Sequence, residues 1–210
     1  MAQNVPLSSF NPQTYSEKAE WLKRSGYPMA FLKFFRTIGI VSSAFSFILL
    51  FATVSTLFHH TGVFQPIHIL EVFLNTVSTI FFAIESIFFY FMTKSGYILF
   101  LIATITYPIQ VYISTVSMGS ISATLFLFFI IVDSVYYAVL NFLLLWYMEK
   151  RRFLFDQKTA LPIAVFDQGR CVKLRMTPAI RKRFIVLYGI YLGVMLLSAF
   201  GFSILWFTFK

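Results

Sequence analysis

Three carboxylates stand inside stretches of this sequence that are otherwise almost continuously apolar. Glu71 and Glu85 lie within residues 67–92, and Asp133 lies within residues 121–146. No Lys or Arg occurs at a comparable depth in either stretch, and a low dielectric favours the protonated form of an unpaired carboxyl group. Acids placed in this way relay protons or bind cations in some membrane proteins. The alternative is that each acid is hydrogen bonded to a neighbouring amide or phenol and fixes helix packing.

The polar residues of 67–92 share one face if this stretch is helical. At 100° per residue they fall within an arc of about 120°. A charge in the middle of a bilayer costs at least ~2.5–3.5 kcal/mol, so this face is expected to turn toward protein or water rather than lipid. Two later stretches add two amides and an acid at similar depth. The predicted polar intramembrane stripe consists of His68, Glu71, Asn75, Glu85, Gln110, Asp133 and Asn141.

The sequence gives weaker signals for metal binding and for catalysis. The three histidines and one acid of a possible metal cluster are His59, His60, His68 and Glu71. Their spacing matches no established metal motif, so we predict no metal site. There is no Ser-His-Asp order, Gly-rich phosphate loop or pair of cysteines, so we predict a protein that is not an enzyme and needs no cofactor. A membrane-embedded enzyme stays open as an alternative.

The composition identifies the elements that must position these residues. The chain is 59% hydrophobic and only 12% charged, about half the charge of a soluble domain. Continuous apolar runs of about twenty residues favour a helical membrane protein over a β-barrel, whose strands alternate in short segments. The net charge of +9 comes from residues that flank the apolar runs, where topology and anionic lipid explain it without nucleic acid. The single cysteine, Cys171, excludes an internal disulfide framework.

We therefore predict an all-α polytopic bundle with about five spans. The predicted spans are 38–58, 67–92, 98–116, 121–146 and 184–207, and Pro108 should kink the third. Residues 1–13 resemble a flexible tail, and the capping-box spacing of Thr14 and Glu17 predicts a short amphipathic helix at the membrane interface. The predicted organisation is a tail and interfacial helix (1–36), four spans (37–147), a basic loop (148–183) and a last span (184–210).

The loop 148–183 is the one substantial segment outside the spans. Two β-prone runs flank a turn at residues 167–170, a pattern typical of a small β-hairpin. Lys150, Arg151 and Arg152 directly follow a span and are expected at the lipid headgroups. Three basic residues farther along the loop are free to meet a protein partner or anionic lipid. This predicted basic cytoplasmic surface consists of Arg170, Lys173 and Arg175.

The distribution of basic residues predicts orientation. With five spans, sixteen of the 17 Lys and Arg fall on one side of the membrane, and the exception is Lys210. The positive-inside rule then places the N-terminus and the 148–183 loop in the cytoplasm and the C-terminus outside.

The leading functional hypothesis is a multi-pass membrane protein that acts as a subunit or scaffold of a membrane assembly. Its polar helix faces, and Gly189 and Gly193 at small-xxx-small spacing, would pack against other membrane subunits or a second copy. The second hypothesis is a small channel or a cation- or proton-coupled transporter that uses the intramembrane acids.

Overall fold

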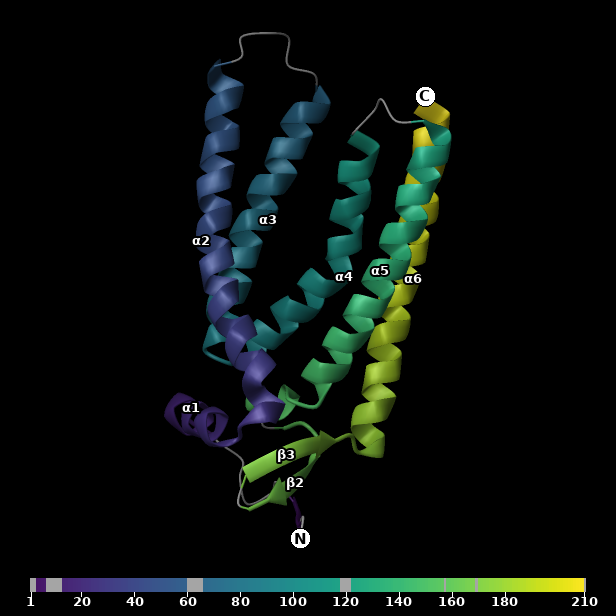
Figure 1. Ribbon diagram of the computed structural model, residues 1–210. Helices are drawn as coiled ribbons and strands as arrows, with labels where there is room; N and C mark the ends of the chain where they lie inside the picture. The colour runs from purple at the N-terminus through teal and green to yellow at the C-terminus, as the bar shows by residue number, and fades with distance from the viewer. Residues whose placement is uncertain are drawn as a thin grey trace.

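The computed structural model describes residues 3–6, 13–59, 66–117, 122–156, 158–168 and 170–209. Five long helices run side by side, and a small sheet and a short helix lie at one end of them, here called the sheet end (Figure 1). Two single turns of 3-10 helix cover Tyr27–Met29 and Arg152–Leu154. The helices are α1 (Tyr15–Arg24), α2 (Ala30–His59), α3 (Pro66–Tyr90), α4 (Lys94–Ser117), α5 (Ala123–Glu149) and α6 (Pro178–Phe209).

Among the described residues, three helical stretches are long and apolar enough to cross a membrane. They are Ala30–Phe51, Ala123–Glu149 and Pro178–Thr208, and shorter apolar stretches cover Asn75–Tyr90 and Lys94–Ile109. Large apolar side chains cover the outside of these helices, with Phe51 77% and Leu197 75% exposed. Water tolerates contiguous apolar patches of this extent poorly, whereas lipid tails solvate them. The helical surface is therefore compatible with membrane insertion.

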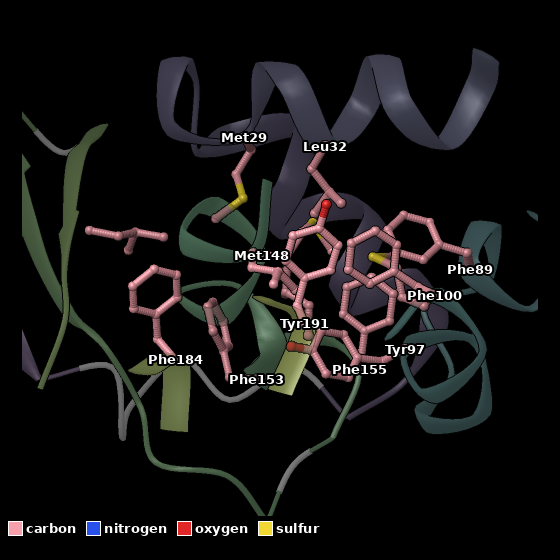
Figure 2. Close-up of a cluster of buried hydrophobic side chains, with 14 of the residues drawn as sticks. Met29, Leu32, Phe89, Tyr97, Phe100, Met148, Phe153, Phe155, Phe184 and Tyr191 are labelled. Carbon is pink, nitrogen blue, oxygen red and sulfur yellow. The ribbon is translucent and has the colours of Figure 1, made fainter. Parts of the chain in front are cut away.

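Many of the most completely buried side chains gather at the sheet end, and others, such as Phe126 and Tyr191, lie between the helices. Figure 2 shows the rings of Phe89, Phe100, Tyr97 and Phe155 gathered to one side of Met148. Ring centroids lie 4.9 Å apart for Phe89 and Phe155 and 5.6 Å apart for Tyr97 and Phe155, distances at which aromatic pairs attract. The helix termini are thus fixed to one another by a compact aromatic cluster.

Helix α1 confirms the predicted amphipathic helix and its capping box. The Thr14 side chain accepts from the Glu17 amide, and the Glu17 carboxylate accepts from the Thr14 amide, so two orphan donors are satisfied. One face of α1 packs on protein, because Leu22 is buried and the Trp21 ring contacts Phe153 edge-on at 5.4 Å. The helix is thus part of the sheet-end core as well as a surface element.

The connection between α3 and α4 is shorter than the sequence suggested. Residues 94–96 lie before the predicted span 98–116, and they form the first turn of α4. Met92 adopts a left-handed φ of 51°, and the Thr93 amide donates to the Phe88 carbonyl at 3.2 Å, which closes α3 in a Schellman-type cap. The Thr93 hydroxyl then accepts from the Gly96 amide at 3.0 Å and caps α4.

Helix α4 bends within its length (Figure 1), and Pro108 is the proline inside it. Proline removes one backbone hydrogen bond and clashes with the preceding turn, which is the expected cause of such a bend. The bend leads α4 from the end of α3 toward α5 and α6, which it contacts.

The predicted hairpin is present, and a third strand joins it. Strands β2 (Ile163–Asp167) and β3 (Arg170–Arg175) pair antiparallel. The prediction of a flexible tail over 1–13 was wrong for Gln3–Pro6, which forms strand β1 and pairs antiparallel with β2. Alternation alone cannot reveal a four-residue edge strand whose partner lies about 160 residues away in the sequence.

Candidate functional site

The polar stripe of α3 is buried where the structure describes it near the sheet end. Glu85 and Ser86 are each 4% exposed, while Phe73, Val77 and Ile84 on the opposite face are exposed. The structure thus buries this part of the predicted polar face. Asn75 of the same stripe is exposed on α3. The helices diverge toward the end opposite the sheet (Figure 1), so fewer neighbours cover α3 at that level.

Helices α2 and α3 approach closely beside the buried acid. A Cβ built on Gly39 would lie 3.4 Å from the Ser86 Oγ atom, so the absence of a side chain at residue 39 permits this approach. The Ser86 Oγ atom is buried without a hydrogen-bond partner among the described residues, and Glu85 has no hydrogen bond or ion pair there either. The α2–α3 interface therefore holds a buried serine hydroxyl without a hydrogen-bond partner among the described residues, and the buried Glu85 precedes it in the sequence.

Asp133 occupies a different environment, on the α4–α5 side of the bundle. Its side chain is partly exposed, and it forms no hydrogen bond or ion pair with a described residue. One turn along α5, the Tyr137 hydroxyl lies 3.5 Å from that of Tyr107 on α4, and the two rings are 5.2 Å apart. The Tyr112 hydroxyl lies 2.6 Å from the Ser134 Oγ atom. Hydroxyl groups of both α4 and α5 thus lie close to Asp133 along the bundle.

Asn141 has a packing role. It is buried, and its Nδ2 donates to the Tyr191 hydroxyl at 3.0 Å, which ties α5 to α6. The Tyr188 hydroxyl adds a bond to the Ala138 carbonyl at 3.1 Å. Such bonds contribute about 0.6–2 kcal/mol each between membrane helices. The described contacts of Asn141 are therefore packing contacts between α5 and α6.

The structure does not bring the described acids into one site. Glu85 belongs to α3 and Asp133 to α5, and α4 lies between these helices (Figure 1). Three further stripe residues fall where side chains are not described, namely His68, Glu71 and Gln110. The described stripe residues are therefore dispersed: Glu85 and Asn75 lie on α3, Asp133 lies on the α4–α5 side of α5, and Asn141 contacts α6.

A second polar centre, at the sheet end, was not anticipated. Arg151 is 5% exposed, its Nε donates to the Pro28 carbonyl at 2.8 Å, and its Nη1 donates to the Tyr147 carbonyl at 2.7 Å. The Tyr147 hydroxyl accepts from the Leu32 amide at 2.9 Å and donates to the Pro28 carbonyl at 3.2 Å. Leu32 lies in the first turn of α2, so the phenol satisfies one of its orphan amides. This clasp holds the start of α2 against the end of α5.

Basic side chains also cap the end of α3. The Lys18 Nζ donates to the Met92 carbonyl at 3.1 Å, and the Arg36 Nε donates to the Tyr90 carbonyl at 2.8 Å. Both side chains are buried, and both lie where the helix dipole favours positive charge. Burial lowers the pKa of Lys18. These residues anchor α1 and α2 to the α3 terminus.

Glu149 is the buried acid of this centre. It is 1% exposed, accepts a hydrogen bond from the Tyr97 hydroxyl, and its Oε2 atom lies 3.5 Å from the Arg183 Nη2 atom. The contacts join the ends of α4, α5 and α6. A signal was present in the sequence, because Glu149 is an acid directly between a span and a run of three basic residues, the usual setting of a structural ion pair.

The expectation that the basic run after α5 lies at the headgroups was wrong for Lys150 and Arg151. Both are buried in protein, and the Lys150 Nζ atom sits 3.1 Å above the centre of the Trp146 ring. Burial, followed by the charges of Arg151 and Lys173, lowers the pKa of Lys150 to about 8. Sequence position beside a span could not reveal that the chain folds back over these side chains.

The predicted basic surface is exposed as expected. Arg170, Lys173 and Arg175 all point outward from β3, an edge strand of the sheet. A register shift between Val165 and Phe166 causes this: Lys173 pairs with Val165 and Cys171 pairs with Phe166, so Val172 is an extra residue. The resulting bulge lets Cys171 and Leu174 both face inward while the three basic side chains stay outside.

The remaining predicted residues are the two glycines of α6 and the possible metal ligands. Gly189 and Gly193 lie exposed on α6, and a Cβ built on either would meet no atom within 4 Å. They therefore pack against nothing in the described part of this chain. No cluster of three metal-ligating side chains occurs among the described residues. His60 lies outside the described residues, and the side chains of His59, His68 and Glu71 are not described.

The sequence contains no Ser-His-Asp order typical of a catalytic triad. The described hydrogen bonds of Tyr147, Glu149 and Arg151 connect different elements of the fold. No protein-family model matches the chain, and neither a curated protein nor a solved structure is similar to it.

Proposed function

We propose that this protein is a non-enzymatic, multi-pass membrane protein with five spans, α2 to α6, and acts as a subunit or scaffold of a membrane assembly. The exposed apolar surface of the helices supports insertion. The buried clasps at the sheet end support a rigid platform, because they fix the termini of several helices through neutral and charged hydrogen bonds.

We further propose that the sheet end lies in the cytoplasm. The basic residues before residue 37, Lys94 and those of 150–183 belong to elements at that one end of the bundle (Figure 1). This grouping is what the positive-inside rule requires of a cytoplasmic end. The N-terminus would then be cytoplasmic and the C-terminus outside.

The observation that carries the proposed function is the division of basic residues at the sheet end. Lys150 and Arg151 are used inside the fold, whereas Arg170, Lys173 and Arg175 stand exposed on an edge strand. Nothing in the fold of the described residues requires these three charges. They fit an acidic segment of a cytoplasmic partner protein, which charged side chains would recognise and steer.

The test removes the three charges together. The variant Arg170→Gln, Lys173→Gln, Arg175→Gln should fold as the parent does and lose binding to a Glu-rich peptide, measured by fluorescence anisotropy with full-length protein in detergent. The matched control Lys158→Gln, Arg181→Gln, Lys182→Gln removes three other exposed charges and should keep peptide binding. Equal loss in both variants would mean non-specific attraction, and flotation of only the parent with phosphatidylserine vesicles would assign the surface to lipid instead.

One observation favours a second candidate, proton- or cation-coupled transport. Glu85 is 4% exposed and has no polar partner among the described residues. In proteoliposomes carrying a pH-sensitive dye, the parent would then conduct protons, and Glu85→Gln would abolish the flux with folding unchanged. An absence of flux in the parent would dismiss this candidate.

A further inference from the structure

Asp133 lies at a depth where an exposed carboxyl group needs a partner. It is ten residues into α5 from Ala123 and sixteen from Glu149, or about 15 Å and 24 Å along the helix at 1.5 Å per residue. Both distances place it within the ~30 Å hydrocarbon core if α5 spans the membrane. A charged carboxylate exposed to lipid at that depth would cost several kcal/mol.

The structure leaves Asp133 at the border between the buried and the exposed faces of α5. Ile130 and Asn141 lie on the buried side, whereas Phe129, Val132 and Tyr136 on the other side are 40%, 44% and 57% exposed. Tyr107 of α4, 45% exposed, continues this surface on the next helix. The result is an apolar and aromatic helix face, here called the Asp133 face (Tyr107, Phe129, Val132, Asp133, Tyr136), with one acid in it.

The chain itself cannot complete this face with a positive charge. Between Arg36 and Lys210 the predicted spans contain no Lys or Arg, and the basic residues that flank them lie at helix ends. A second copy therefore presents no cation at this depth in either orientation. The hydroxyl groups of Tyr107 and Tyr137 lie 3.5 Å from each other, and neither carries a positive charge that could pair with Asp133. Any cation that pairs with Asp133 therefore comes from outside this chain.

We propose that the Asp133 face binds a transmembrane helix of a different membrane protein that carries a Lys or Arg near the middle of the bilayer. A carboxylate and an ammonium or guanidinium group that meet in a low dielectric form a strong charge-assisted hydrogen bond, and the aromatic residues around Asp133 exclude lipid from it. The inference rests on the proposed role in a membrane assembly and names the chemistry of one partner. It does not depend on the basic surface of β3.

The test uses a defined probe. Synthetic 21-residue Leu/Ala helices carry one central Lys, or Leu at the same position, and are reconstituted with the labelled full-length protein in phosphatidylcholine vesicles. Energy transfer then measures association. We expect the Lys peptide to bind the parent at least tenfold more tightly than Asp133→Asn, and the Leu peptide to bind both equally. Glu85→Gln, which removes a buried acid, is the matched control and should bind the Lys peptide as the parent does.

A second measurement protects the test against misfolding of the variant. A photocrosslinker at Tyr136 should capture the Lys peptide, and one at Val186, which is exposed on α6, should not. Equal binding of the Lys peptide to parent and Asp133→Asn would overturn the proposal. Association between two copies that depends on Asp133 would also overturn the proposal, because the face would then bind a second copy. A proton flux that depends on Asp133 would overturn it as well, because the carboxyl group would then face water. Loss of Glu-rich peptide binding by the β3 variant bears on the proposed function alone.

Discussion

At the scale of single residues, the polar side chains of this protein separate into two kinds. Arg151, Tyr147 and Glu149 each form hydrogen bonds with other elements of the chain. Glu85 and Asp133 have no hydrogen bond among the described residues. The first kind explains why the helix ends stay together, and the second marks positions where another molecule or a proton is needed.

Tyr147 gives the most direct test of the clasp. The variant Tyr147→Phe removes a hydroxyl that accepts from the Leu32 amide and donates to the Pro28 carbonyl. Because a buried amide and carbonyl lose a partner, we expect the free energy of unfolding to fall by about 1–3 kcal/mol. Thermal unfolding in detergent measures this. Tyr136→Phe, at an exposed position, is the control and should unfold with the parent. Equal melting temperatures for all three proteins would contradict the role of the clasp.

Lys150 should make stability depend on pH. Its folded pKa is lowered to about 8, so the unfolded chain holds the proton more tightly and protonation at neutral pH opposes folding. Stability should therefore rise with pH, through 8 and upward to the ordinary lysine value. We expect about 1 kcal/mol between pH 7 and 9, less than the full shift because solvent and the Trp146 ring stabilise the charged form.

The comparison is between variants measured at both pH values. Lys150→Met should remove the rise, while Lys158→Met at an exposed site should keep it. A rise of the same size in Lys150→Met would place the titrating group elsewhere.

At the scale of elements, the α3–α4 turn brings the backbones of two long helices into close contact. A Cβ built on Gly96 would lie 2.4 Å from the backbone carbonyl carbon and oxygen of Phe88. Backbone atoms cannot move aside as the end of a side chain can, so residue 96 accepts only glycine without a shift of one helix. The close approach also explains how so short a turn can reverse the chain between two long helices.

The variant Gly96→Ala should therefore lower the free energy of unfolding by about 2–4 kcal/mol. Gly189→Ala and Gly193→Ala are matched controls in a helix with open space around each Cβ. Alanine has the higher helix propensity, so each control should be neutral or stabilising by up to ~1 kcal/mol. Thermal unfolding of the three variants decides the matter, and a Gly96→Ala protein as stable as its parent would show that the turn can relax.

At the scale of the whole molecule, the protein is unevenly built. A dense aromatic core and a three-stranded sheet join the helices at one end (Figures 1 and 2). Away from that end, α2 and α3 stand apart from α5 and α6 (Figure 1). Helices α5 and α6 stay together, with the rings of Phe126 and Trp206 stacked at 4.4 Å.

Orientation in the membrane can be measured directly with single cysteines in a Cys171→Ser background. Cys171 is buried, so its replacement by the smaller Ser is suited to a reference protein. Ser122→Cys, at the start of α5, should react with an impermeant maleimide added outside, and Lys158→Cys should react only after the membrane is opened. Labelling of Lys158→Cys from outside would reverse the proposed orientation.

The sequence by itself determined the class of fold and several of its parts. Long apolar runs predicted the helical bundle, Thr14 and Glu17 predicted the cap of α1, and the turn at 167–170 predicted the hairpin. The polar arc around Glu85 predicted which side of α3 is buried. These features follow from the period of hydrophobicity and from contacts between residues close in sequence, which a sequence displays directly.

Only the tertiary structure decided which polar residues hold the fold and which remain unused. Arg151 reaches the Pro28 carbonyl, 123 residues away, and β1 pairs with a strand about 160 residues later. Lys150 and Arg151, two residues of the basic run expected at the headgroups, are buried in the fold. Such partners meet through long-range packing, whose geometry depends on the whole chain, and no local pattern in the sequence encodes it.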